Sequence, residues 1–107
     1  MPRRVSLDLP KEVDEALAAF GTPARLAIID VLRTDEPASK AHIATVLGMD
    51  SKTTIYHLAK LVALDVVLAD PPPGPGRTGQ HPRYSLNHRR IARLFAALGR
   101  MLGTSGR

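Results

Sequence analysis

The stretch KAHIATVLGMDSKTTIYHLAKL, residues 40–61, carries two short apolar patterns on either side of a single glycine. Apolar residues recur there at helical spacing, first Ile43, Ala44 and Leu47 and then Leu58, Leu61 and Val62. Gly48 supplies the permissive backbone of a tight turn between them. Ser39 is suited to cap a first helix, Lys40–Leu47, and either Asp50 or Ser51 to cap a second that runs to about Leu64. The stretch therefore predicts two short helices joined by a tight turn.

A β-hairpin is predicted directly after the second helix. The short β-branched run Val66–Ala69 is typical of a strand, and Arg83–Leu86 of its return strand. Residues 71–82, PPPGPGRTGQHP, cannot be helical and form the hairpin tip. Two short helices around a glycine-containing turn are the helix-turn-helix motif, and a hairpin after the second is a wing. The predicted fold class is therefore mainly α with a β-hairpin wing, a winged helix-turn-helix.

Further helices are predicted on both sides of this unit. Upstream, a helix over Lys11–Phe20 ends at Gly21, and a second begins at Pro23 after a Thr22 cap. Downstream, Asn87 caps a last helix over 88–102 with a continuous apolar stripe. The expected order is α-α-α-α-β-β-α within one domain, residues 11–102, preceded by an extended arm, 1–10, and followed by a flexible tail, 103–107.

Charge is distributed unevenly along the 107 residues. Residues 1–50 contain six Lys and Arg against eight Asp and Glu, a balance of −2, whereas residues 51–107 contain nine against two, a balance of +7. Such segregation indicates a polyanionic partner that the second half contacts.

No apolar run reaches membrane-spanning length, and the N-terminus lacks the apolar stretch of a signal peptide, so we expect a soluble cytoplasmic protein.

Four pieces of residues 21–87 resemble the ArsR-type winged-helix repressors. They are GTPARLAIIDVL (21–32), IATVLGM (43–49), KTTIYHLAKL (52–61) and RYSLN (83–87), in the family's order over about two-thirds of the chain. Helices 11–20 and 88–102 stand where that family places its dimerisation helices. The resemblance implies a homodimer that represses transcription from an inverted-repeat operator. The predicted dimerisation residues are Val13, Leu17, Phe20, Ile91, Leu94, Phe95, Leu98, Met101 and Leu102.

The chain departs from the family pattern in four places. Asp65 stands where glycine is usual, so a different exit from the second helix of the motif is expected. Thr54 replaces a common valine and leaves a hydroxyl to satisfy, and Ile55 replaces a small polar residue at a point facing DNA. The wing tip is longer and richer in proline than is typical.

The residues predicted to contact double-stranded DNA lie on the second helix of the motif and on the wing. A helix fits the major groove and presents the exposed side of its N-terminal half to base edges and phosphates, and an arginine on a wing can enter the adjacent minor groove. The predicted DNA-binding residues are Ser51, Lys52, Thr53, Ile55, Tyr56, His57, Lys60, Arg77, Thr78, Gln80 and Arg83.

Three basic sites allow more than one interpretation. His57 either contacts a phosphate or packs beside the turn. Arg25 is expected to have a structural role, because the family more often uses this arginine in an ion pair. Arg89 and Arg90 lie in the first turn of the last helix, where the helix dipole disfavours cations, so they either bind an anionic partner or, as we expect, belong to a solvated face.

No metal site, cofactor or enzymatic activity is expected. The chain has no cysteine, and the last helix offers His88 alone, with no acidic residue after it, for the zinc site that the family builds there. GPGRTG in the wing lacks the Gly-Lys-Ser/Thr of a phosphate-binding loop. No Ser/His/Asp set or pair of carboxylates points to catalysis.

Two alternative functions remain open. Residues 3–32 faintly resemble a ribbon-helix-helix protein, in which Arg4, Ser6 and Asp8 of the arm would read DNA. The other alternative is a winged-helix module that binds protein and no DNA, and it would lack salt-dependent duplex binding.

Overall fold

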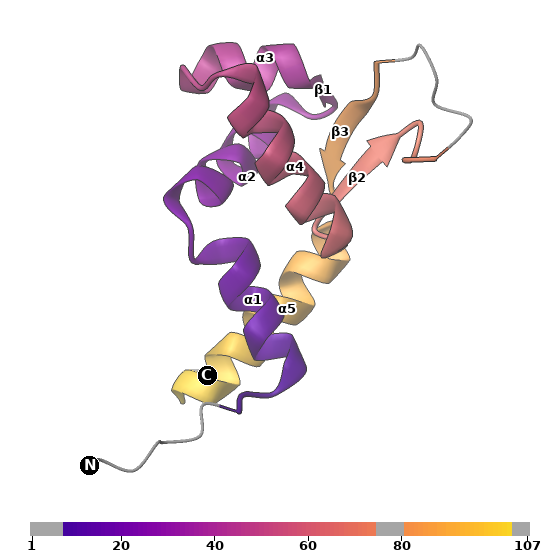
Figure 1. Cartoon of the computed structure of the whole chain (residues 1–107). Coiled ribbons are helices and arrows are strands. Elements are labelled where there is room, and N and C mark those ends of the chain that lie inside the picture. Colours follow the sequence, from indigo (N-terminus) through magenta and orange to yellow (C-terminus); the bar gives the residue numbers. More distant parts are fainter. Residues whose placement is uncertain (1–7, 75–80, 104–107) are drawn as a thin grey trace.

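The structure is a computed structural model that describes residues 8–74 and 81–103 (Figure 1). The elements in chain order are α1 (Lys11–Phe20), α2 (Pro23–Asp35), β1 (Ala38–Ser39), α3 (Lys40–Leu47), α4 (Ser51–Ala63), β2 (Val67–Asp70), β3 (Arg83–Leu86) and α5 (His88–Leu102). The predicted succession of helices and hairpin is present. The structure adds β1, a strand that the sequence did not predict, and the antiparallel sheet has the order β1-β3-β2.

Most predicted helix ends are confirmed. The Ser39 hydroxyl accepts a hydrogen bond from His42 N (3.1 Å) at the start of α3, and Asn87 Oδ1 accepts one from Arg90 N (3.2 Å) at the start of α5. Thr22 precedes Pro23 at the start of α2, but its side chain makes no capping hydrogen bond, so that detail was wrong. β2 begins one residue later than predicted, at Val67.

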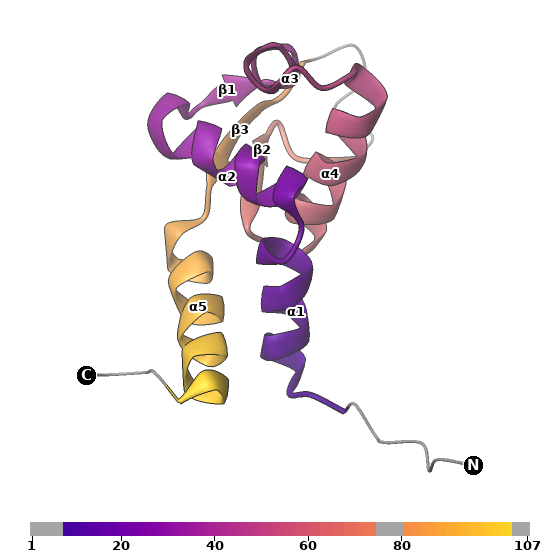
Figure 2. The same ribbon diagram turned by 90° about the vertical axis from the view of Figure 1, so that its left-hand side faces the viewer.

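Helices α2, α3 and α4 and the sheet form a unit that we call the head (Figures 1 and 2). Its core is a single apolar cluster to which every one of these elements contributes at least one side chain. The largest fully buried members from the head are Ile28, Leu32, Ile43, Leu58, Leu61, Val66 and Val67. Two-fold alternation along β3 sends Tyr84 and Leu86 into this cluster and leaves Arg83 exposed.

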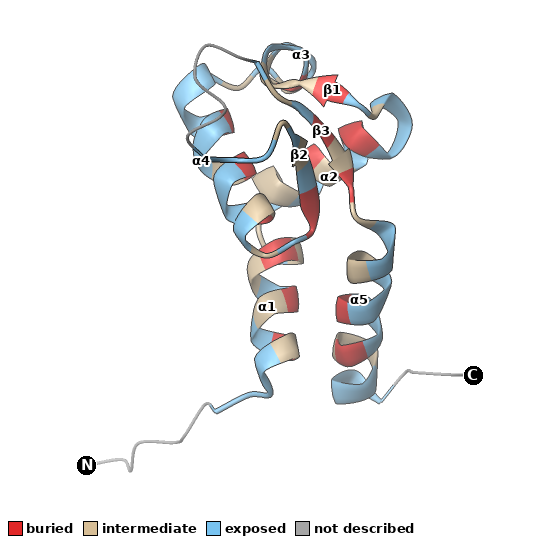
Figure 3. Cartoon of the chain, turned by 90° about the vertical axis from the view of Figure 1, so that its right-hand side faces the viewer, coloured by how far each residue is buried: buried red, intermediate tan, exposed pale blue. Residues whose placement is uncertain are grey.

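Helices α1 and α5 lie side by side and project from the head as a two-helix stem (Figures 2 and 3). Ion pairs join the stem helices at two levels: Arg93 Nε lies 2.6 Å from Glu12 Oε2, and Arg90 Nη2 lies 3.0 Å from Glu15 Oε1. Among the described residues, no helix is long and apolar enough to cross a membrane.

The stem corrects part of the predicted dimerisation set. Val13 is 3% exposed and Leu94 is 0% exposed within a single chain, so neither has appreciable surface left for a partner chain to cover. Assigning these two to an intermolecular surface was therefore wrong. Phe20, Ile91 and Leu98 are partly buried against the core. The large apolar side chains that the stem helices leave exposed are Leu17, Phe95, Met101 and Leu102.

The side chain of Glu36, just after α2, fixes the junction between head and stem. Its Oε1 accepts a hydrogen bond from Leu86 N (2.7 Å), and its Oε2 lies 2.9 Å from His88 Nε2. The hydrogen bond from the Leu86 N–H, followed by that from His88, lowers the pKa of Glu36. One carboxylate thus joins the end of α2 to the end of β3 and the start of α5, and His88 is occupied in this structural role.

Candidate nucleic-acid interface

The turn between α3 and α4 has a defined geometry at both ends. Gly48 ends α3 in the left-handed conformation, with φ 65° and ψ 28°, which glycine adopts without strain. Asp50, one of the two predicted caps, begins α4: its Oδ1 accepts a hydrogen bond from Thr53 N at 2.6 Å, and this bond lowers the pKa of the Asp50 carboxyl. The start of α4 is therefore fixed by side-chain capping as well as by packing.

The inner face of α4 anchors the helix in the head. Thr54, Leu58 and Leu61, spaced four and three residues apart, are buried. The Thr54 hydroxyl donates to the main-chain oxygen of Asp50 at 2.8 Å, so the extra polar group at this position has its partner inside the helix. The replacement of the family's valine is accommodated without an unsatisfied hydroxyl.

The outer face of α4 presents the predicted DNA-contacting side chains to solvent. Ile55 is 47% exposed and Tyr56 is 53% exposed. Lys60 Nζ lies 5.5 Å from the centre of the Tyr56 ring, within cation–π distance. Ser51, Lys52 and Thr53 are also exposed, and α4 contains no carboxylate. This face therefore combines two ammonium groups, hydroxyl donors and one apolar side chain.

His57 differs from the other predicted residues of α4, because it is only partly exposed and lies against α2. Its Nδ1 accepts a hydrogen bond from Arg25 Nε at 3.1 Å. Burial, and then the charge of Arg25, lower the pKa of His57, so the neutral imidazole with its proton on Nε2 is the form that fits this contact. The geometry agrees with the packing interpretation of His57.

Arg25 has the expected structural role but not the expected partner. Its Nη1 donates to the main-chain oxygen of Ala18 at 2.8 Å, in addition to the bond from Nε to His57. Its guanidinium lies 5.9 Å from the centre of the Tyr56 ring. Within the described residues no carboxylate pairs with it, so a histidine and a carbonyl replace the ion pair that the family resemblance implies.

The hairpin β2–β3 lies beside α4 (Figure 1). Of the predicted wing residues, Arg77, Thr78 and Gln80 lie outside the described part of the chain. Arg83 is exposed and shares a hollow of about 440 Å³ with Asp35 and His42, whose side chains lie 2.7 Å apart. The structure therefore places Arg83 on the side of the sheet away from Ile55.

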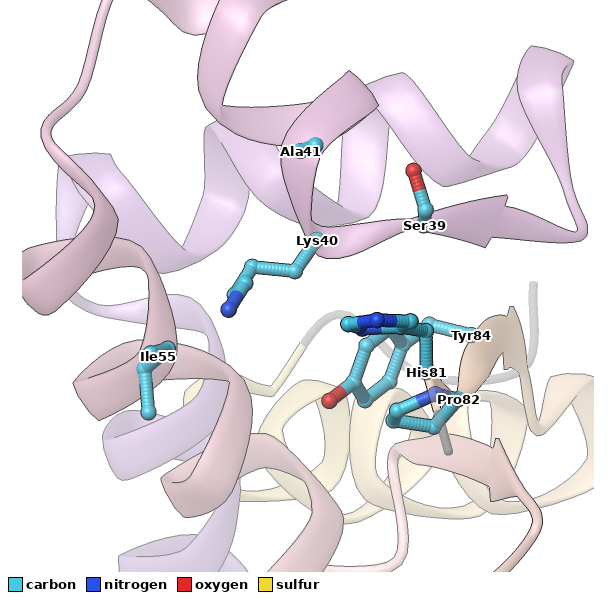
Figure 4. A pocket seen from close by; sticks show the side chains of 7 residues that line it. All are labelled: Ser39, Lys40, Ala41, Ile55, His81, Pro82 and Tyr84. Carbon is cyan, nitrogen blue, oxygen red and sulfur yellow. The ribbon is translucent and has the colours of Figure 1, made fainter. Parts of the chain in front are cut away.

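A larger hollow, of about 610 Å³, separates the start of α3 and the hairpin from the middle of α4 (Figure 4). Its lining is Ser39, Lys40, Ala41, Ile55, His81, Pro82 and Tyr84. Lys40 and the hydroxyl end of Tyr84 extend into the space that faces Ile55 (Figure 4). Among the described residues no carboxylate lines this hollow, so it continues the positive character of the outer face of α4.

The chain is similar to two solved structures over most of its length. One is the homodimeric winged helix-turn-helix DNA-binding domain of Mb0332 from Mycobacterium bovis, a possible ArsR-family transcriptional regulator, with 26% identity, a TM-score of 0.61 and coverage of 86% of this chain and 79% of that one. The chain is a winged helix-turn-helix domain that resembles the ArsR type. NolR from Sinorhizobium fredii matches with 24% identity, a TM-score of 0.61 and coverage of 89% of this chain and 88% of that one. No protein-family model and no curated protein sequence matches the chain.

In this winged helix-turn-helix domain, α4 takes the place of the recognition helix and β2–β3 that of the wing. The exit from the recognition helix was expected to differ because Asp65 replaces glycine. Asp65 instead adopts the left-handed backbone itself, with φ 64°, a conformation that aspartate tolerates better than most residues. The exit turn thus keeps a glycine-like geometry, and the expectation of a different exit was wrong.

Sequence reasoning missed Lys40 and Ser39 as part of this surface. They lie at the start of the first helix of the motif, more than ten residues before Ile55, and enter the hollow because β1 pairs with β3. A signal was present in the sequence: a lysine directly after the serine cap of a helix whose N-terminal N–H groups favour anions.

The winged-helix domain also uses part of its positive charge internally. Arg90 and Arg93 pair with Glu15 and Glu12, so two of the basic residues of the second half neutralise acids of the first. The side chain of Arg90 is only 20% exposed and is paired within the chain, so both predicted interpretations, a solvated face and an anionic partner molecule, were wrong for Arg90. Arg89 is exposed.

In the described part of the chain, no three His, Asp or Glu side chains gather closely enough to hold a metal ion.

Proposed function

We propose that this protein is a sequence-specific, double-stranded DNA-binding transcriptional regulator that acts as a homodimer. Each protomer inserts the N-terminal half of the recognition helix into a major groove, and the wing lies beside it. Two-fold symmetry then requires an inverted-repeat operator with half-sites about one helical turn apart. Occupation of such a site represses transcription by excluding polymerase.

The observation that carries this proposal is the outer face of the recognition helix. Ile55, Tyr56, Lys60 and the residues around them are exposed although the helix is anchored by three buried side chains on its other face. Lys52 and Lys60 can neutralise phosphates, Thr53 and Tyr56 can donate hydrogen bonds to phosphate oxygens, and Ile55 can pack on a thymine methyl. The likeness to the DNA-binding domain of Mb0332 supports the same function.

The dimer in this proposal pairs through the stem. Four large apolar side chains of the stem are exposed, namely Leu17, Phe95, Met101 and Leu102. Exposed apolar patches on soluble domains mark protein–protein interaction sites. The homodimeric state of the Mb0332 domain supports a dimer, and the exposed residues of the stem are the reason for placing its interface there. We propose that the partner's stem covers these residues.

The test is selection of duplexes from a random-sequence pool by the full chain, followed by affinity measurements with Ile55→Ser. We expect a shared inverted repeat among the retained duplexes. Ile55→Ser should relax preference at one base pair per half-site, at a cost of about 1–3 kcal/mol for the selected sequence, and leave the salt dependence unchanged. Leu26→Ser, in which a residue of α2 that is 50% exposed is changed, is the matched control and should leave both properties unaltered.

Two results would overturn the proposal. Absence of salt-dependent duplex binding by the folded chain would point to a protein-binding winged helix instead. Unchanged discrimination by Ile55→Ser, with DNA binding intact, would show that the outer face of α4 is not at the bases.

A further inference from the structure

Arg25 connects three helices through one guanidinium. It belongs to α2, and its Nε donates to His57 in the middle of α4 at 3.1 Å. Its Nη1 donates to the carbonyl oxygen of Ala18 at 2.8 Å. Ala18 lies in the last turn of α1, where carbonyl groups have no partner within the helix. The recognition helix is therefore tied to a stem helix through a side chain that belongs to neither.

Arg90 makes the same kind of connection from α5. Its Nε donates to the carbonyl oxygen of Leu64, the C-cap of α4, at 3.0 Å. Its Nη2 lies 3.0 Å from Glu15 Oε1 on α1, and the side chains of Arg90 and Glu15 are only 20% and 23% exposed. Partial burial limits the screening of the attraction between these two charges by solvent.

The two arginines thus share a pattern: each makes one bond to the recognition helix and another to α1. Arg25 contacts α4 near its middle and Arg90 contacts its C-terminal end, so the two bonds hold different points along the helix. Fixing a rod at two separated points restricts its tilt as well as its position. Arginine suits this task because its planar fork donates in two directions at once, whereas lysine offers a single ammonium.

We propose that Arg25 and Arg90 are positioning residues that set the orientation of the recognition helix relative to the stem. This inference rests on the proposed function, because the stem is the proposed dimer interface. If the stems pair, the orientation of each α4 on its stem determines the separation of the two recognition helices. The arginine pair then determines which spacing between operator half-sites the dimer accepts.

The test compares Arg25→Lys, Arg90→Lys and the double variant with the unchanged protein. These substitutions keep the positive charge and remove the two-directional fork. The probes are the duplex selected from the random pool, the same duplex with two base pairs inserted at its centre, and a duplex with one half-site. Arg33→Lys is the matched control, because Arg33 pairs with Asp30 inside α2 and joins no two helices.

We expect the insertion to weaken binding of the unchanged protein and of Arg33→Lys about tenfold or more, because half-site spacing is set by rigid geometry. In the double variant the same insertion should cost less than about threefold, with single-half-site affinity within about twofold of the unchanged protein. If the substitutions merely reduced the fraction of folded protein, binding to all three duplexes would fall by the same factor. Retention of the full spacing preference by the folded double variant would overturn the inference.

A measurement without DNA keeps the inference separate from the proposed function. The chain has no cysteine, so Asp14→Cys on α1 and Ala59→Cys on α4 can be spin-labelled at two exposed positions. In protein diluted with unlabelled chain, the distribution of distances between the labels should broaden when Arg25 and Arg90 are both replaced by lysine and stay narrow with Arg33→Lys. An unchanged distribution would overturn the inference even if DNA binding is confirmed. If the double variant does not fold, each single variant should show a smaller broadening, and its absence in both would also overturn the inference.

Discussion

The exposed ring of Phe95 offers the most direct test of the proposal that two copies of this chain pair through the stem. Phe95 lies on α5 next to Leu94, yet it is 67% exposed whereas Leu94 is 0% exposed. The two neighbours should therefore separate assembly from folding. We predict that Phe95→Asp yields a folded monomer, and that Leu94→Ala yields a dimer of reduced stability.

The size of the Phe95 effect follows from its exposed area. At 67% exposure, a side chain of about 200 Å² presents about 130 Å² to a partner, worth about 3 kcal/mol at about 25 cal/mol per Å². Two-fold symmetry doubles this to about 6 kcal/mol, or about four orders of magnitude in the dimer dissociation constant. The carboxylate introduced by the substitution would add the cost of a charge in an apolar contact.

We expect the unchanged dimer to have a submicromolar dissociation constant, so sedimentation velocity at about ten micromolar chain measures this effect directly. The unchanged protein should sediment with twice the chain mass of 11.6 kDa, and Phe95→Asp with the mass of one chain. Leu26→Asp changes a residue of α2 that is 50% exposed and should remain dimeric. A dimeric Phe95→Asp, or a monomeric Leu26→Asp, would show that the stem is not the interface. Leu94→Ala should lower the free energy of unfolding by about 2–5 kcal/mol while the dimer persists.

Three further outcomes are expected. In the proposed complex, Lys60→Ala removes one phosphate contact per protomer, so the slope of log affinity against log salt should become shallower by about 1.8 units per dimer. Duplex binding measured across a salt series tests this, and an unchanged slope would place Lys60 away from the DNA phosphates. Thr54→Val should change the free energy of unfolding, measured in urea, by less than about 1 kcal/mol. The reason is that the N–H of residue 54 still donates to the Asp50 carbonyl (3.0 Å) after the hydroxyl is lost. A loss of several kcal/mol would refute this account. The pKa of His57 is lowered by burial and then by the charge of Arg25. Below the ordinary histidine pKa of about 6.5, the unfolded chain therefore binds more protons than the folded chain. The free energy of unfolding accordingly decreases as the pH is lowered, until the pH falls below the folded pKa. Unfolding followed from about pH 7.5 to about pH 5.5 should therefore show a weaker pH dependence in His57→Gln, and an equal dependence would contradict the assigned role of His57.

The sequence alone was sufficient for the helices, the turn and the hairpin because their signals are local. Gly48, Asp50, Pro23 and Asn87 act on residues within one helical turn, and the structure places each at the predicted helix end. β1 escaped prediction because it has two residues and exists only by pairing with β3, far along the chain. A pattern of two residues has no periodicity to detect.

The errors in the candidate sites arise from contacts that periodicity does not contain. The apolar stripe of α5 identifies residues that avoid water, but not whether α1 or a second chain covers them, so Leu94 and Phe95 were grouped together. Arg90 was judged by its position near a helix start, whereas its partners, Glu15 and the Leu64 carbonyl, lie 75 and 26 residues away in the chain. Lys40 likewise lies at the hollow beside Ile55 because of a pairing between distant parts of the chain, that of β1 with β3.

The two-sided construction of the recognition helix has a consequence for how such proteins diverge after gene duplication. Thr54, Leu58 and Leu61 bear the packing, while the exposed positions between them contribute little to it. Under the proposed function, copies of the gene can therefore acquire new operator preferences at the exposed positions while the buried face maintains the fold, and cross-talk between copies can be removed one base contact at a time. His57 is the exception, since it lies between the two sets and bonds to Arg25. Under the proposed function, we expect a change there to alter the angle at which the other side chains of the helix meet the operator.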